Sequence, residues 1–169
     1  MPSPVLTLHL GNPTNNYANP NVLNRPGSNT ATPSHQVQMA PSQNWGWANV
    51  GNTGDAPADA TVTYYFCTPG GPVDQWSYFL NNLIGTATIP VPANDTTGTQ
   101  ATSNTSWAPT VNAHTCMIAV VQSPDDQLPP GFMDPDVTPE IADRHVGQQN
   151  LTIVSAPVGS TQTVRFRAP

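Results

Sequence analysis

Apolar and polar residues alternate in short runs along the chain, a pattern that predicts β-strands. The clearest run is 60–67, "ATVTYYFC", in which Val62, Tyr64 and Phe66 share one face while Thr61 and Thr63 face the other way. A second clear strand is predicted at 113–121, where "AHTCMIAVV" ends in a continuous apolar stretch. Weaker runs predict strands at 5–10, 35–40, 45–50, 84–91, 100–107, 150–154 and 163–167. Such short strands, separated by turn residues, favour an antiparallel β-sandwich of about 7–9 strands.

Long polar segments separate these runs. Residues 11–34 are rich in Asn, Pro and Gly and lack periodicity, so we expect an arm or irregular loop that packs on another surface. Residues 76–85, "WSYFLNNLIG", fit either a helical turn or an irregular strand, and we favour the strand. Residues 122–145 are predicted to form a long loop that can hold one helical turn at 139–143. The expected organisation is a strand and arm at 1–40, a sandwich at 41–156 and a strand or tail at 157–169, in one domain overall.

Composition supports an all-β chain and narrows its partners. The 169 residues include twenty prolines, which interrupt helices because each removes a backbone donor. Four arginines, no lysine and ten acidic residues give a formal net charge of −6, which argues against nucleic acid and anionic membranes as partners. No run approaches the ~20 apolar residues of a membrane span, and the start lacks a basic leader, so we expect no membrane insertion and see no signal peptide. The chain is then expected to stay where it is made or to be the mature part of a larger precursor.

Four motifs occur in order between residues 45 and 154. They are an Asn-x-Gly turn leading into a strand at 49–66, an Ile-Gly strand closed by Val-Pro-Ala at 84–93, a Trp-x-Pro turn with a His-x-Cys strand at 107–121, and a closing strand at 143–154. This ordered set resembles the bacterial immunoglobulin-like modules of the CARDB (cell-adhesion-related) type. The usual paired asparagines are replaced at 143–145, and Gln149 stands where arginine is common. The resemblance implies an immunoglobulin-like sandwich with long loops and extended termini, which adheres, spaces or packs and does not imply catalysis.

His114 and Cys116 lie two residues apart, so on a strand they share one face. Zinc needs four ligands, and the other histidines, at 9, 35 and 145, are scattered along the chain. A nucleophilic Cys–His site needs an exposed thiolate, whereas Cys116 lies in an apolar strand. We therefore favour structural roles and expect no catalytic residue. In an immunoglobulin-like sandwich the strand that ends at Cys67 meets the strand that begins near Cys116, so the two are candidates for a disulfide or for two buried free thiols.

Two further groups of residues are candidates for ligand binding. The first is a set of aspartates in one loop: Asp125, Asp126, Asp134 and Asp136. Carboxylates that converge can bind calcium, although an acidic loop can also simply be solvated. The second is a set of tryptophans: Trp45, Trp47 and Trp76. Their rings could stack on sugars, although aromatic residues of sandwiches also fill the core.

Together these features favour a non-catalytic structural protein without a cofactor. A weakly charged polar surface and extended termini suit a subunit of a larger particle, such as a phage capsid decoration or appendage protein, or of an extracellular filament. Its expected partners are other protein subunits, in a homo-oligomer or a larger assembly bound through the termini. Its expected location is a virion or a cell surface. The alternative is a secreted adhesion module that binds surface glycans or calcium.

Overall fold

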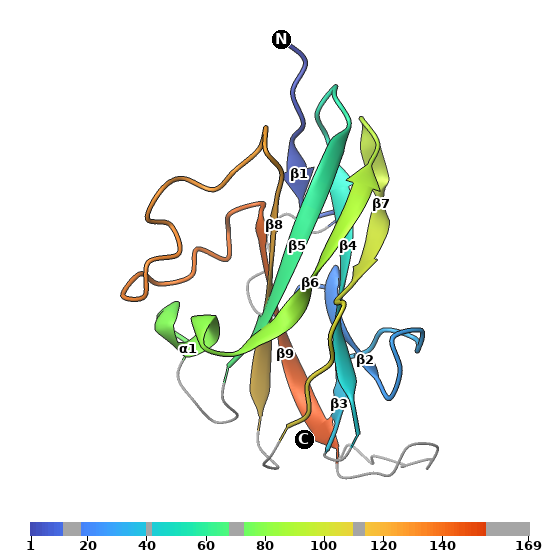
Figure 1. Cartoon of the computed structure of the whole chain (residues 1–169), viewed down its shortest axis with the longest axis vertical. Helices are drawn as coiled ribbons and strands as arrows, with labels where there is room; N and C mark the ends of the chain where they lie inside the picture. Colours follow the sequence, from blue (N-terminus) through green and yellow to red (C-terminus); the bar gives the residue numbers. More distant parts are fainter. Residues whose placement is uncertain (12–17, 40–41, 68–72, 110–113, 155–169) are drawn as a thin grey trace, which may run out of the picture.

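The computed structural model describes residues 1–11, 18–39, 42–67, 73–109 and 114–154, which form two packed sheets (Figure 1). The strands are β1 (Leu6–Thr7), β2 (Val22–Pro26), β3 (Gln36–Gln38), β4 (Asn44–Asn52), β5 (Ala58–Phe66), β6 (Leu83–Val91), β7 (Asp95–Thr102), β8 (Thr115–Gln122) and β9 (Val146–Val154). The helix α1 (Ser77–Leu80) lies between β5 and β6. The predicted immunoglobulin-like, all-β sandwich is confirmed. Within the described ranges no helix is long and apolar enough to cross a bilayer.

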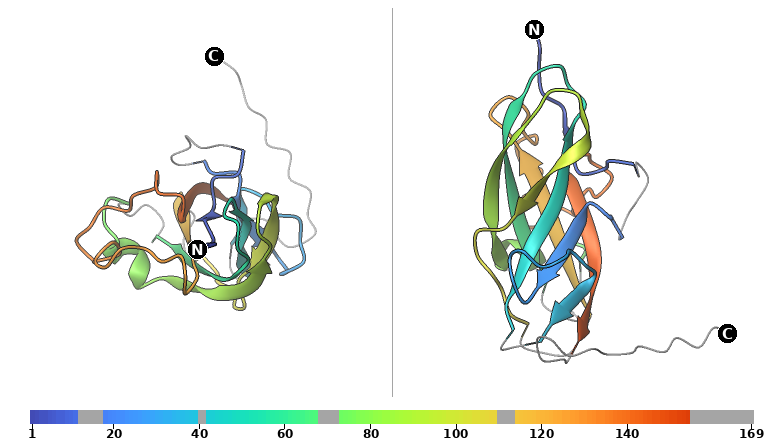
Figure 2. Two further views of the ribbon diagram at one scale, coloured as in Figure 1. Left: turned by 90° about the horizontal axis from the view of Figure 1, so that it is seen from above. Right: turned by 90° about the vertical axis from the view of Figure 1, so that its right-hand side faces the viewer.

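The two sheets face each other, as Figure 2 shows. In sheet 1, β4 pairs with β1 and β2 along one side and with β7 along the other, always antiparallel. Sheet 2 has the order β3-β9-β8-β5-β6, in which only the β3–β9 pair is parallel. Backbone bonds join the sheet edges, since Asn24 pairs with Ser34 before β3 and the Asn104 N–H donates to the Thr86 carbonyl. These links cover edges that would otherwise pair with other chains.

The main core lies between the sheets and follows the alternation read from the sequence. Val62 and Tyr64 of β5 are fully buried, whereas Thr61 on the opposite face is exposed. Gly46 of β4 faces the Tyr64 ring so closely that a Cβ atom there would lie 2.5 Å from a ring carbon. Only glycine therefore allows the two sheets to approach at this point. All the other strands contribute to this core, including Leu6, Val22, Val37, Ala48, Ile84, Ala101, Met117 and Leu151.

A second cluster, which we call the lateral core, covers the outer face of sheet 2. Its buried members are Cys67, Trp76, Phe79, Cys116, Ile118, Val120 and Val146. Alternate residues of β8 contribute to the two cores, so β8 is buried on both faces except at its last residue. The helix α1 and the 123–145 loop lie on the same side of the sandwich (Figure 1). Strands buried on both faces have continuous apolar runs, and this explains the "MIAVV" stretch.

Two segments differ from the prediction in kind. Residues 77–80 form α1 instead of a strand, because the turn buries Trp76 and Phe79, three residues apart, in the lateral core. The predicted irregular arm at 11–34 contains β2, which ends in Pro26. Proline is tolerated at such a strand end, but it weakens the sequence pattern.

Other predicted elements differ in their bounds. The strand expected at 100–107 lies at 95–102, because the regular pairing with β4 stops at Thr102 and Trp107 forms only an isolated bridge with Asn44. β1 is shorter than the expected 5–10 run, and β9 begins four residues earlier than predicted. No helix forms at 139–143 in the structure. The strand predicted at 163–167 lies outside the described residues.

Candidate functional site

Cys67 and Cys116 lie opposite each other at the end of the β5–β8 ladder. The Cys67 N–H donates to the Cys116 carbonyl at 2.9 Å, and the Cys116 N–H donates to the Cys67 sulfur at 3.3 Å. Both are free thiols, and their exposed fractions are 1% and 3%. The ring Nε2 of His114, an exposed residue, lies 3.6 Å from the Cys116 sulfur. A disulfide between the two cysteines stays a prediction.

The two thiols differ in acidity because they share a hydrogen bond. The bond from the Cys116 thiol lowers the pKa of Cys67 to about 6, against burial, which raises it. The same bond, together with burial, raises the pKa of Cys116. The 3.3 Å bond from the Cys116 N–H also favours a negative charge on the Cys67 sulfur.

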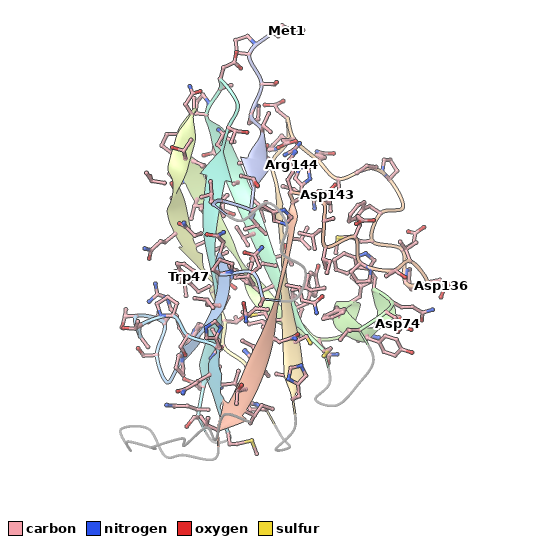
Figure 3. All side chains as sticks on the ribbon, turned by 180° about the vertical axis from the view of Figure 1, so that it is seen from behind. Met1, Trp47, Asp74, Asp136, Asp143 and Arg144 are labelled. Carbon is pink, nitrogen blue, oxygen red and sulfur yellow. The ribbon has the colours of Figure 1, made fainter. Side chains whose placement is uncertain are left out.

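The structure does not bring the four candidate calcium aspartates together. The Asp126 side chain is buried, with 8% of its surface exposed. Asp125, Asp134 and Asp136 are exposed along the loop. Asp136 lies at the far side of the lateral core from Arg144 (Figure 3). Across the described ranges, no three His, Cys, Asp or Glu side chains lie together as a potential metal site.

Asp126 instead belongs to a charged network that fastens β1. Its carboxylate accepts two bonds from Arg144, at 2.7 and 2.6 Å, and one from the Leu6 N–H at 2.7 Å. His145 is buried, and its two ring nitrogens lie 3.2 Å from Asp126 and 2.7 Å from Asp143. Burial raises the pKa of Asp126, but the bonds from Arg144 and Leu6 outweigh it and the net shift is downward. The network is structural, because its oxygens and guanidinium are engaged with one another.

The tryptophans predicted to stack on sugars have different surroundings. Trp76 is fully buried in the lateral core, so it cannot stack on a ligand, and this candidate was wrong. Trp45 and Trp47 share the outer face of sheet 1, where Trp47 is 8% exposed and Trp45 is half-buried. Figure 3 shows Trp47 on the side of the sandwich away from the lateral core. Of the three rings, that of Trp45 has the most surface available for contact.

Arg25 lies on the same outer face and was not a candidate in the sequence. It pairs with Trp45 across β2 and β4, and its Nε donates to Thr102 of β7 at 3.1 Å, so its side chain crosses β4. Its other nitrogens donate to the Ala31 carbonyl and, at 3.4 Å, to Gln100. No carboxylate pairs with Arg25 among the described residues. Its positive charge is therefore fixed in place but not neutralised.

The end of the sandwich that carries Met1 has an apolar depression of about 330 Å³. It is lined by Pro57, Ala58, Asp59, Pro90, Val91 and Pro92. They come from the start of β5, the end of β6 and the β4–β5 and β6–β7 turns, which lie side by side at this end (Figure 1). Asp59 and the nearby Asp55 are exposed. In the sequence, the residues of this depression lie in two proline-containing segments, "DAPAD" at 55–59 and "IPVPA" at 89–93. Both were interpreted only as the ends of predicted strands.

Comparisons with known proteins find similarity among solved structures. Known sequence families and curated proteins give no match to the chain. Among solved structures, the chain resembles the CARDB domain of a Pyrococcus furiosus protein, in a crystal structure in complex with di-metal ions. The identity is 13% and the TM-score 0.48, over 92% of this chain and 98% of that one. The solution NMR structure of that domain gives 13% identity and a TM-score of 0.41, over 79% and 94%. The sequence motifs and the structure comparison therefore both point to a CARDB-type domain. This similarity is one of fold alone.

Proposed function

We propose that the protein is a non-catalytic assembly module in which the C-terminal segment of one copy binds the proline-lined depression of a second copy. Such a subunit suits a phage capsid decoration or appendage protein, or an extracellular filament. The observation that carries the proposal is the complementarity between these two parts of the chain. The module needs no cofactor for this role.

Charge is divided unequally along the chain. All ten acidic residues precede residue 155, together with two of the four arginines, which leaves a net charge of −8 there. The last fifteen residues carry only Arg165 and Arg167, a net charge of +2. Asp59 lines the depression and Asp55 lies beside it, both exposed. Opposite charges on two binding surfaces speed their encounter and set the orientation in which the two copies bind.

Apolar residues are also complementary. In "TVRFR", Val164 and Phe166 alternate with the two arginines, so an extended chain would present an apolar side and a basic side. The depression offers three exposed prolines and an apolar floor to the first side, and aspartates to the second. β9 ends at the end of the sandwich opposite Met1 (Figure 1). Repeated contacts of this kind would therefore join copies head to tail.

Truncation after Val154 is the direct test. In sedimentation velocity, the full chain is expected to show a weight-average mass that rises with concentration, whereas the truncated chain stays monomeric. Added salt should weaken the association because exposed charge pairs are screened. A full chain that stays monomeric at all concentrations, with its tail bound to its own body, would contradict assembly; fifteen extended residues reach about 50 Å, enough for such a contact.

Charge variants give the matched control. Replacing Arg165 and Arg167 together by Gln should raise the dissociation constant by about 2- to 30-fold, since each exposed pair contributes about 0.2–1 kcal/mol. Asp59→Asn should have part of this effect. Asp136→Asn removes the same charge at an exposed position on the lateral loop and should leave association unchanged. Equal effects of the two aspartate variants would indicate a general charge effect and would exclude the depression.

A second candidate function is the binding of acidic glycans at the outer face of sheet 1. The observation that favours it is the unneutralised Arg25 beside the half-buried ring of Trp45. An aromatic ring can stack on a sugar, and a guanidinium binds a carboxylate with two hydrogen bonds. In calorimetric titrations with oligogalacturonate, Trp45→Ala and Arg25→Gln should each abolish binding, whereas Gln43→Ala, at an exposed neighbouring position, should not. Absence of binding by the unmodified chain would remove this candidate.

A further inference from the structure

We propose that Cys67 and Cys116 form a reversible disulfide site that reacts with small disulfides, with Cys67 as the attacking thiolate and Cys116 as the resolving thiol. The proposal does not depend on the assembly function. It concerns a modification of the sandwich itself, at the end of the β5–β8 ladder.

Backbone geometry places the two residues within disulfide reach. Phe66 pairs with Met117 in the antiparallel register, so Cys67 is opposite Cys116, and the 2.9 Å bond from the Cys67 N–H to the Cys116 carbonyl continues the ladder. Directly opposed residues have Cα atoms about 4.5–5.5 Å apart, and disulfides span about 4.4–6.8 Å. Both side chains belong to the lateral core, so they lie on the same face of the sheet. A bond between them requires side-chain rotation without a change of register.

The hydrogen bonds around the sulfurs assign the two roles. The Cys67 sulfur accepts the Cys116 N–H at 3.3 Å, and this bond stabilises a thiolate. The Thr115 hydroxyl donates instead to the Cys67 carbonyl at 2.7 Å. The Cys116 thiol donates to the side-chain carbonyl oxygen of Asn150 at 3.1 Å, so its proton has an acceptor in the folded chain. Cys116 therefore keeps its proton until a base removes it.

His114 is positioned to be that base. Its Nε2 lies 3.6 Å from the Cys116 sulfur, and the histidine is exposed. His114 and Asn150, both exposed, contact this sulfur, so the pair lies one side chain below the surface. A reagent reaches Cys67 when this end of the ladder opens locally, as ladder ends do more readily than strand centres.

A small disulfide such as oxidised glutathione is the oxidant in this reaction, because it accepts the two electrons that the cysteines lose. The Cys67 thiol gives its proton to water and its thiolate attacks one glutathione sulfur. The glutathione disulfide bond breaks, and the glutathione thiolate that leaves takes up a proton from water. Cys116 then gives its proton to His114 and attacks the Cys67 sulfur, which releases the second glutathione thiolate, and that thiolate takes the proton. Two cysteine thiols are thereby oxidised to one disulfide, while one glutathione disulfide is reduced to two thiols.

The test is oxidation of the native full chain in glutathione redox buffers, followed by alkylation and mass spectrometry. We expect both thiols to disappear together, and dithiothreitol to restore both. The bond closes a loop of about 50 residues, so the midpoint of thermal unfolding should rise on the order of 10 °C. If the native chain keeps both thiols while the urea-unfolded chain forms the bond, the proposal is overturned.

Single variants separate the roles of the two cysteines. Cys116→Ser should trap a glutathione adduct on Cys67, because no resolving thiol remains. In Cys67→Ser, Cys116 should form a glutathione adduct at least about tenfold more slowly than Cys67 does in Cys116→Ser, because the Cys116 thiol keeps its proton. His114→Gln should lengthen the lifetime of the mixed disulfide without preventing its formation. Equal adduct rates in the two cysteine variants would overturn the assignment of Cys67 as the nucleophile.

Discussion

Replacing Trp76 by alanine is expected to lower the free energy of unfolding by about 3–5 kcal/mol, the range for a large buried aromatic side chain. Trp76 is fully buried and contacts Tyr65 of β5 and Phe79 of α1 edge to face, with ring centroids 6.5 and 6.3 Å apart. Its backbone N–H donates to the Val137 carbonyl of the 123–145 loop at 2.9 Å. The indole thus connects the sheet, the helix and the loop, and its removal leaves a cavity at their centre.

Tyr78 provides the matched control for this prediction. It lies two residues away in α1 and is 38% exposed, so Tyr78→Ala should change the free energy of unfolding by no more than about 0.5 kcal/mol. Urea unfolding followed by circular dichroism measures both variants. Trp76→Phe should be the mildest change at this position, because the indole N–H has no hydrogen-bond partner in the structure. Similar losses for Trp76→Ala and Tyr78→Ala would show that the lateral core contributes little to stability.

Replacing Asp126 by alanine is expected to lower the free energy of unfolding by about 2–4 kcal/mol. The change leaves the buried Leu6 N–H without its acceptor, and the Arg144 guanidinium loses both bonds to the carboxylate while keeping its bond to the Leu6 carbonyl. The Arg144 side chain is 37% exposed and can be hydrated, so the loss should fall toward the lower part of the range for buried pairs. Asp125→Ala, at the exposed neighbouring position, should have almost no effect. Equal losses for the two variants would contradict a fastening role for the network.

The same network predicts a pH dependence with a definite sign. The pKa of Asp126 is lower in the folded chain than its unfolded value of about 3.9, so the unfolded chain binds the proton more readily. Its contribution to stability is complete above about pH 5 and is lost as the pH falls through the folded pKa. The charged or titratable groups around Asp126 in this network are Arg144, His145 and Asp143. The stability difference between the unmodified chain and Asp126→Asn should therefore shrink between about pH 5 and pH 2, measured by urea unfolding.

The strands of sheet 2 were the most predictable part of the fold. In β5, Val62 and Tyr64 alternate with threonines, and this alternation indicates which face of the strand is buried. Such a pattern is local, so the sequence alone is enough to predict the strand. For β8 the sequence predicted a strand, but the reason for its continuous apolar run was not visible. That reason is the lateral core, which is formed by segments far away in the sequence. The helical turn could have been found, because Trp76, Phe79 and Leu80 have the i, i+3, i+4 spacing of one helix face.

The candidate sites depended on contacts that a single sequence does not reveal. Four aspartates in one loop looked alike, yet Asp126 alone meets Leu6, 120 residues earlier in the chain, and Arg144. Arg25 was overlooked because it matters as a cation without a carboxylate partner among the described residues, and pairing of this kind is seen only in the structure. The thiols and tryptophans were recognisable by residue type, and the structure then separated the buried Trp76 from the half-buried Trp45.

The parallel pairing of β3 with β9 has a mechanical consequence. β9 ends at the opposite end of the sandwich from Met1, so tension between the two ends would run along the strands (Figure 1). Ladder hydrogen bonds lie across the strands, and such a load would shear many of them at once instead of opening them one by one. β9 is held in this way by β8 along one side and by β3 along the other. A chain of these sandwiches under stretch would carry force through its sheets, and the β8 and β3 ladders on either side of β9 would resist it by shear.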